Sequence, residues 1–337
     1  MLWSKLTAVI VMQLVLSYIL GRTLIPVFRR MKTGKYDGYI GDRLRTDGSE
    51  PAFGGAVMLL VLAFGVMTVS AVVGEALRLY LILGYIAVIC LSGIIEDFMT
   101  DVCGLSYGLN IGIKLGWRFS ASLVFLLIYK NCGFISEEIL LPFRLGFIDL
   151  GAVFAPLGAV VMTVVIGCFS LLNRFGTDET TCYGGLAQTV IFIQGLTAAV
   201  IGGIISSESL AVFGYITSAS ALGALIWGLS PAKLRGGSSA GSLCGGISAA
   251  LVCFTSNIEI GMLLAAMPAV CDAVCTAVQL AVYKTSRKLV FKGSSLHSHL
   301  KAKGMSDYKV IFIFTVCAVV FSVGAVLYAV YSTNVVL

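Results

Sequence analysis

Long apolar runs separated by short polar loops constrain this chain more than any other feature of its sequence. About 20 apolar helical residues cross the hydrocarbon core of a bilayer. With 58% hydrophobic and 12% charged residues, the composition excludes a soluble globular domain, whose charged share is about a quarter. We expect an all-α, polytopic membrane protein with a single integral membrane domain over residues 1–337. Ten spanning helices are expected, over residues 6–28, 53–74, 77–95, 113–129, 151–172, 186–206, 209–229, 242–256, 258–283 and 309–332.

The Lys and Arg residues predict the orientation, because positively charged loops stay in the cytoplasm. All but four of the 23 lie in loops or helix ends on one side. Both termini are therefore expected outside, and the net charge of +6 reflects this bias rather than binding of nucleic acid. The longest outward loop, 130–150, is expected to be a plain solvated connection. The four Lys and Arg residues that do not lie on the cytoplasmic side are Lys5, Arg78, Lys130 and Arg144.

Three carboxylates end the third apolar run, at Glu96, Asp97 and Asp101. An ionisable group at membrane depth must be solvated, paired or bound to a cation, which makes this stretch a candidate functional site on the cytoplasmic face. The alternative is a helix end at the lipid head groups, and the stretch alone does not decide between them. Lys114, at the start of the next helix, is expected to pair with these acids or with a phosphate.

Two further cytoplasmic segments are rich in glycine. Residues 43–55 combine basic residues with a Pro and a Gly pair, and residues 231–242 are mostly small. Such backbone can hold an anion with exposed amides; the alternatives are a basic anchor before a turn and a flexible linker. The last loop, 288–310, holds the only two histidines, His297 and His299, among several lysines, which is also typical of an anionic-lipid anchor.

Taken in order, the cytoplasmic loops resemble those of the MraY family, the phospho-N-acetylmuramoyl-pentapeptide transferases, within the polyprenyl-phosphate N-acetylhexosamine-1-phosphate transferase superfamily. The family's Gly-Thr-Pro-Thr-Met-Gly-Gly is similar to residues 49–55, which keep the Pro and the Gly pair. Its Asp-Asp-x-x-Lys resembles residues 96–100, with Glu96 for the first acid and Thr100 for the lysine. Its Gly-Leu and following Lys are kept as Gly108, Leu109 and Lys114.

Three more motifs resemble the family in the second half of the chain. Asn-Leu-Thr-Asp-Gly-Leu-Asp-Gly-Leu-Ala is similar to residues 177–187, with extra residues and without the second Asp. Pro-Ala-x-x-Phe-Met-Gly-Asp is similar to residues 231–238, where the family's magnesium-binding Asp falls on Ser238. Pro-x-His-His-His and Lys-Gly-Trp-x-Glu-x-Lys-Val resemble residues 295–299 and 303–310, with Ser298 for the middle His; this match is the most specific to MraY.

The resemblance implies a Mg²⁺-dependent enzyme of the bacterial plasma membrane. It would transfer phospho-N-acetylmuramoyl-pentapeptide, or a related phospho-sugar, from a UDP-N-acetylhexosamine to undecaprenyl phosphate, giving lipid I and UMP. Asp97, Glu96 and Asp178 would hold the metal and, with His297, form the catalytic set. Homodimers are common in this fold. The implied substrate-binding residues are Lys114, His299, Asn173, Lys233, Gly237 and Ser238.

The departures from the family pattern support a second hypothesis. Lost charges at Thr100, near Gly184, at Ser238 and at Ser298 would suit a catalytically weak or inactive paralogue that binds lipid carrier, nucleotide or a partner as a regulator. A transporter is disfavoured, because the sequence shows no inverted repeats and we expect no acid buried at mid-membrane.

Overall fold

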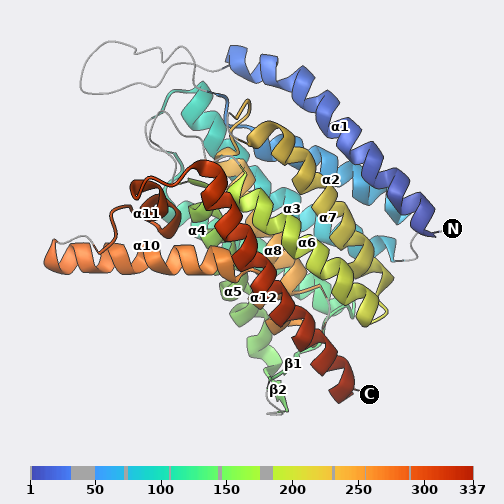
Figure 1. The fold of residues 1–337 in the computed structure, drawn as a ribbon. Coiled ribbons are helices and arrows are strands. Elements are labelled where there is room, and N and C mark those ends of the chain that lie inside the picture. Colours follow the sequence, from blue (N-terminus) through green and yellow to red (C-terminus); the bar gives the residue numbers. More distant parts are fainter. Residues whose placement is uncertain are drawn as a thin grey trace, which may run out of the picture.

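The computed structural model describes residues 2–31, 50–71, 75–105, 108–142, 146–174, 185–229, 232–254, 256–287 and 290–336. These form an all-α bundle with one small hairpin (Figure 1). The elements are α1 (Leu2–Met31), α2 (Gly54–Ser70), α3 (Ala76–Asp97), the π-helical turn η1 (Phe98–Val102), α4 (Ile111–Asn131), β1 (Glu138–Leu140), β2 (Phe147–Asp149), the 3-10 turn η2 (Gly151–Val153), α5 (Phe154–Arg174), α6 (Leu186–Ile204), α7 (Glu208–Gly228), α8 (Gly237–Val252), α9 (Glu259–Ala265), α10 (Met267–Ser286), α11 (Leu296–Ala302) and α12 (Asp307–Val336).

Each expected apolar run is helical, but the runs differ in length. Within the described residues, seven helices are long and apolar enough to cross a membrane, or eight if the bent α9–α10 pair counts as one span. Helices α2 and α8 are apolar but have 17 and 16 residues, about 25 Å at a rise of ~1.5 Å per residue, against a ~30 Å core. The chain is therefore a multi-pass membrane protein.

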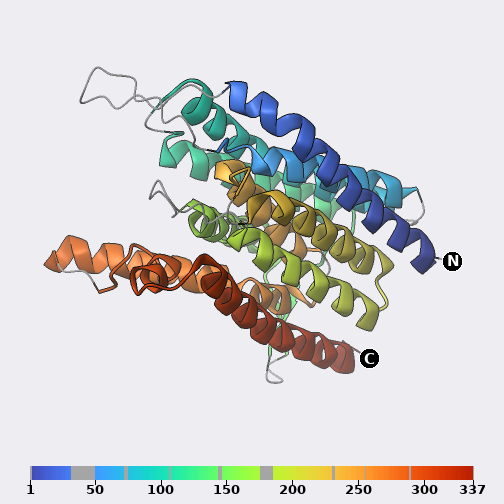
Figure 2. The same ribbon diagram turned by 45° about the horizontal axis from the view of Figure 1, so that its top comes forward.

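The expected single helix over 258–283 is wrong, because the chain bends there by 66° between α9 and α10. Pro268 lies in the first turn of α10. Proline lacks an N–H and its ring clashes with the preceding turn of a continuous helix, so the helix stops and restarts in a new direction. Helix α10 consequently projects from the side of the bundle (Figures 1 and 2).

The segment 130–150 is more ordered than the solvated connection we expected. Strands β1 and β2 pair antiparallel, with Glu138 opposite Asp149. The hydroxyl of Tyr328 on α12 donates a hydrogen bond to the carbonyl of Leu140, at 2.5 Å. Because the backbone of β1 is bonded to α12, the hairpin is fixed against the bundle.

Helix α8 lies at the centre, against α3, α5, α2 and α6. Every residue from Ser239 to Val252 is buried, and most of them are Gly, Ala or Ser. Small residues let helix backbones approach closely where lipid offers no hydrophobic drive between helices: a Cβ on Gly245 would lie 2.6 Å from the Cα of Ile166 on α5. The sequence of α8 thus suits an interior position.

Arg78 joins several elements at the end of the bundle opposite to the N-terminus of α8. Its guanidinium donates to the hydroxyl of Tyr129 at 2.9 Å and to the carbonyl of Phe254 at 2.6 Å. It also pairs with Glu75 at 2.9 Å, and Glu75 accepts a hydrogen bond from Ser209 on α7 at 2.7 Å. The Ser209 hydrogen bond and the Arg78 charge together lower the pKa of Glu75, against a smaller opposing effect of burial.

Candidate active site

Asp97, the last residue of α3, caps the N-terminus of α8. Its Oδ1 accepts a hydrogen bond from the amide of Ser238 at 2.7 Å, and its Oδ2 accepts one from the amide of Ser239 at 2.9 Å. Helix α8 has no side-chain cap of its own. The first amides of a helix lack partners within the helix, and a carboxylate there is favoured by the helix dipole. A side chain 3% exposed therefore joins two segments that are distant in the sequence.

The small residues over 231–242 serve close packing at this junction. Gly237 has φ +66°, and a Cβ there would lie 2.5 Å from Asp97 Oδ2 and overlap the carbonyl oxygen of Ala52. Glycine alone tolerates both conditions without strain. Helix α8 also begins at Gly237 rather than at residue 242, because Asp97 supplies partners for its first amides. In the described part of this segment, the flexible-linker alternative is wrong.

The segment before α2 docks against the segment before α8. The amide of Arg235 donates to the carbonyl of Pro51 at 2.9 Å, and the amide of Gly54 donates back to the carbonyl of Arg235 at 3.0 Å. Asp101, on η1, accepts a hydrogen bond from the amide of Ala52 at 3.0 Å. Three segments that carry the motif resemblance, 50–55, 96–101 and 235–239, thus meet around two carboxylates.

Asp101 belongs to the candidate stretch, but the sequence prediction assigned it no catalytic or metal-binding role. It is 5% exposed and lies on the π-helical turn η1. Such turns occur often at functional sites. Its position four residues after Asp97, at the same helix end, was the signal that could have identified it.

Glu96 and Lys114 form a buried ion pair between α3 and α4. Their side chains are 6% and 7% exposed, and Lys114 Nζ donates to Glu96 Oε1. This confirms the prediction that Lys114 pairs with the acids. The helix start bearing Lys114 is set by Asn110, whose side chain accepts a hydrogen bond from the amide of Gly112 at 2.9 Å.

Asn173 brings the end of α5 to the same junction. Its Nδ2 donates to the carbonyl of Gly237 at 2.5 Å. One turn earlier, Ser170 accepts a hydrogen bond from Arg118 of α4 at 2.8 Å. Asn173, Gly237, Ser238 and Asp97 are therefore brought together, and their binding of substrate stays a prediction.

Lys233 lies elsewhere. Its Nζ is 5.8 Å from the centre of the Trp227 ring, and its amide donates to the carbonyl of Trp227 at 2.9 Å. Trp227 in turn donates to the carbonyl of Ser17 on α1 at 3.1 Å. In the hydrogen bonds and ion pairs of the described residues, the Lys233 side chain takes no part in the Asp97 junction.

The two histidines organise the α10–α11 segment. His297 is fully buried, and its Nδ1 lies 3.1 Å from each carboxylate oxygen of Asp272 on α10. The amide of His297 also donates to Asp272 Oδ1, at 3.1 Å. His299 accepts a hydrogen bond from the amide of Lys292 at 3.1 Å and meets the ring of Phe291 edge-on.

Asp272 lies within the expected apolar run 258–283, although we expected no acid to be buried at mid-membrane. It is 0% exposed in α10, and the Nδ1 atom of His297 lies 3.1 Å from its carboxylate. A lone acid inside an apolar run is by default a functional candidate, and this signal was present in the sequence.

The metal prediction depends partly on Asp178, which lies outside the described residues. Elsewhere, Glu96 is paired with Lys114, and Asp97 and Asp101 each bond to backbone amides. Within the described ranges, no group of three or more His, Cys, Asp or Glu residues is arranged to hold a metal ion. The described carboxylates therefore do not fit an assembled Mg²⁺ site, and we derive no step through a metal.

Comparison with known proteins places this geometry in context. No protein-family model matches the chain. The chain is similar to proteins named phospho-N-acetylmuramoyl-pentapeptide-transferase. That of Halalkalibacterium halodurans is 27% identical, covering 99% of this chain and 100% of the relative. That of Desulfitobacterium hafniense is 26% identical, covering 93% and 94%; that of Oceanobacillus iheyensis is 26% identical, covering 95% and 96%. This similarity over nearly the full length of the chain supports its resemblance to the MraY family.

Proposed function

We propose that this protein is a phospho-sugar transferase of peptidoglycan synthesis in the bacterial plasma membrane. It would transfer phospho-N-acetylmuramoyl-pentapeptide from UDP-N-acetylmuramoyl-pentapeptide to undecaprenyl phosphate, giving lipid I and UMP. The observation that carries the proposal is the junction around Asp97, because it unites three segments whose motifs resemble those of the transferases. The full-length similarity to proteins of that name supports it.

In this reaction a phosphate oxygen of the lipid attacks the β-phosphorus of the UDP-sugar. The bond between that phosphorus and the bridging oxygen breaks, and the bridging oxygen leaves with UMP. Phosphoryl transfer depends on positioning and on neutralisation of charge more than on covalent catalysis. Lys114 supplies a cation at the α3–α4 end of the site, and an ammonium group has three donors, so that it can hold Glu96 and a phosphate oxygen together.

The junction gives the other proposed residues distinct roles. Asp97 and Gly237 set the position of the α8 N-terminus, where Ser238 stands at the family's acidic position, and Asn173 fixes the neighbouring backbone. The burial of His297 supports a positioning role, holding α11 to α10 through Asp272, while direct contact of His297 or His299 with the pyrophosphate stays a prediction. Asp178 and Lys233 stay predictions of the resemblance.

The test is release of UMP by the purified protein with undecaprenyl phosphate and UDP-N-acetylmuramoyl-pentapeptide, in Mg²⁺ and in EDTA. Release that stops in EDTA and returns with added Mg²⁺ is the expected result, and it would support a metal held jointly by Asp178, the junction and the substrate phosphates. Other UDP-N-acetylhexosamines tested in parallel identify the donor.

One observation favours the second candidate, a non-catalytic paralogue that binds lipid carrier or nucleotide. Glu96, Asp97 and Asp101 are all engaged by protein donors, and Ser238 replaces an acid. Absence of UMP release with every donor, together with measurable binding of UDP-sugar or undecaprenyl phosphate, would support this candidate over the transferase.

A further inference from the structure

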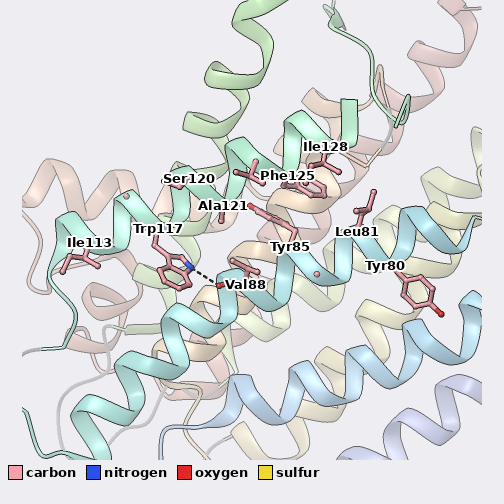
Figure 3. A pocket seen from close by; sticks show the side chains of 13 residues that line it. Tyr80, Leu81, Tyr85, Val88, Ile113, Trp117, Ser120, Ala121, Phe125 and Ile128 are labelled. Atoms are coloured by element: carbon pink, nitrogen blue, oxygen red, sulfur yellow. Dashed lines mark hydrogen bonds between the residues drawn. The ribbon is translucent and has the colours of Figure 1, made fainter. Parts of the chain in front are cut away.

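A pocket of about 410 Å³ lies between the C-terminal half of α10 and residues 291–294, and we call it the α10 pocket. Figures 1 and 2 show α10 projecting from the bundle on this side. Leu280, Tyr283 and Phe291 form an apolar wall of the pocket, and Lys292 also lines it. All described lining residues of the larger groove between α3 and α4, of about 730 Å³, are uncharged (Figure 3). Of these two cavities, the α10 pocket is therefore the one that can recognise a charged head group.

The wall of the pocket opposite α10 is held on two sides. Gln279 of α10 is buried, and its Oε1 accepts hydrogen bonds from the amides of Val290 and Phe291, at 3.1 and 3.0 Å. Its Nε2 donates to the carbonyl of Phe291 at 3.2 Å. On the other side, the amide of Lys292 donates to Nδ1 of His299 on α11 at 3.1 Å. The pocket is therefore formed by protein contacts alone, before any ligand binds.

The chain around the pocket carries positive charge only. Residues 273–306 contain six Lys and Arg residues and no Asp or Glu. Arg287 caps the C-terminus of α10, and its guanidinium carbon lies 5.7 Å from the centre of the Tyr283 ring. The side chains of Arg287 and Lys292 are exposed, and within the described residues neither forms an ion pair. Two cations thus flank an apolar pocket and are available to an anion.

Helix α10 also carries the apolar surface that a lipid chain requires. Val274, Val278 and Leu280 are 54%, 44% and 55% exposed, and α9 and α10 together form a candidate bent span. The Lys and Arg pattern predicts that the basic end of α10 lies on the cytoplasmic side. The pocket is therefore expected where hydrocarbon gives way to the head groups of the cytoplasmic leaflet.

These properties match an anionic phospholipid. Clusters of about four to eight Lys and Arg residues at the cytoplasmic end of a membrane helix attract anionic head groups. A phosphodiester between Arg287 and Lys292 would place an acyl chain against the apolar wall. The acceptor of the proposed reaction must instead bring its phosphate to the junction around Asp97, and none of the described residues that line the α10 pocket belongs to that junction.

We infer that the α10 pocket binds an anionic phospholipid of the cytoplasmic leaflet, at a site separate from the transfer reaction. Because the segment 290–292 is hydrogen-bonded to both α10 and α11, a lipid seated there braces the segment that leads to His297. The inference does not depend on the proposed transferase function, since lipid binding is measured without turnover.

Photo-crosslinking tests the location. The full-length protein in phosphatidylcholine nanodiscs is irradiated with phosphatidylglycerol that carries a diazirine in one acyl chain, and the labelled peptides are mapped by mass spectrometry. We expect label within residues 276–294, displaced by unlabelled phosphatidylglycerol but retained with added phosphatidylcholine or undecaprenyl phosphate. Label spread over all exposed helices would mean contact with bulk lipid only and would overturn the inference. Displacement by undecaprenyl phosphate as strong as that by phosphatidylglycerol would also overturn it, in favour of a polyprenyl phosphate.

Substitution of the two cations tests the head-group contact. The double variant Arg287→Gln/Lys292→Gln should bind phosphatidylglycerol at least five-fold more weakly in native mass spectrometry, and Lys292→Arg should stay within two-fold of wild type. Lys303→Gln is the matched control, because Lys303 is an exposed cation of the same acid-free stretch that does not line the pocket.

Melting temperatures in lipid-free detergent show whether the variants fold, and Lys292→Gln alone replaces the double variant if that one does not. An affinity of the cation variant equal to that of wild type, or an equal loss in Lys303→Gln, would refute the assignment.

Discussion

The Nδ1 atom of His297 lies 3.1 Å from both carboxylate oxygens of Asp272, and neither side chain reaches solvent. The pair connects the start of α11 to α10, the helix that leaves the bundle at the 66° bend. It ties the histidine motif to α10, alongside the packing of Leu296 and Leu300 against the core.

Asp272→Ala should destabilise the protein by about 2–3 kcal/mol, because it removes the carboxylate that accepts from the amide of the fully buried His297 and lies beside its ring. Thermal unfolding in detergent measures the loss. His299→Ala is the control, since His299 is partly exposed, and it should cost less. Equal losses in the two variants would show that the buried pair has no special role in holding α11.

Gly237→Ala should lower both thermal stability and UMP release, the latter at least ten-fold. The added Cβ meets Asp97 and the carbonyl of Ala52 at a positive φ, so the α8 N-terminus must shift away from Asp97. Gly203→Ala on α6 is the control, because a Cβ there meets nothing within 4 Å. Wild-type behaviour of Gly237→Ala would contradict the junction as described.

Asp97→Asn should abolish UMP release and also cost about 1–3 kcal/mol of stability. The carboxylate accepts hydrogen bonds from two backbone N–H groups. An asparagine side chain has one acceptor oxygen, and its NH₂ group would face the second backbone N–H, so that two donors would meet. Unfolding and UMP release are measured on the same preparation. Activity that survived the change would remove Asp97 from the catalytic set.

Ser238→Asp restores the family's acid beside Asp97 and should make stability depend on Mg²⁺. Two adjacent carboxylates repel each other without a cation, while Mg²⁺ typically binds one or two carboxylates together with waters. We expect a lower melting temperature than wild type in EDTA and recovery in Mg²⁺, with little response of wild type. If the melting temperature of Ser238→Asp were the same with and without Mg²⁺, residue 238 would lie outside any metal site.

Glu75→Gln should matter at neutral pH and become silent in acid. The pKa of Glu75 is lowered in the folded protein, so its ion pair contributes stability above the unfolded-state pKa of about 4.3 and loses it as pH falls through the folded value. The melting temperatures of wild type and variant should therefore differ at pH 7 and converge below about pH 4. A constant difference would contradict the assigned pKa direction.

The sequence predicted the helical class and the apolar runs, because hydropathy is a local property. It also offered pairing of Lys114 with the acids as one of two alternatives, because helix ends on one face lie near each other. It placed the helix starts less well. For residues 237–241 the sequence left an anion-binding loop and a flexible linker open, since their helical start depends on an acid supplied by another segment. The break near Pro268 was also missed, although the proline was present in the run.

The roles of single residues were harder to predict than the motifs that contain them. Asp97 was predicted as a metal ligand, but its capping of α8 depends on tertiary structure that one sequence does not display. Asp272 was passed over within an apolar run, and its partner His297 was read as exposed to substrate. In both cases the missing information was which distant segment supplies the hydrogen-bond donors to a buried acid.

The capping of α8 by Asp97 also has a consequence for biosynthesis. Its two amide partners are 141 and 142 residues further along the chain, so at ~5–20 residues per second they emerge roughly 10–30 s after α3. During that interval the carboxylate must stay hydrated, because burial of an uncompensated charge is costly. We therefore expect nascent α3 to keep its Asp97 end at the cytoplasmic surface, and the two halves of the protein to lock together only after α8 has been translated.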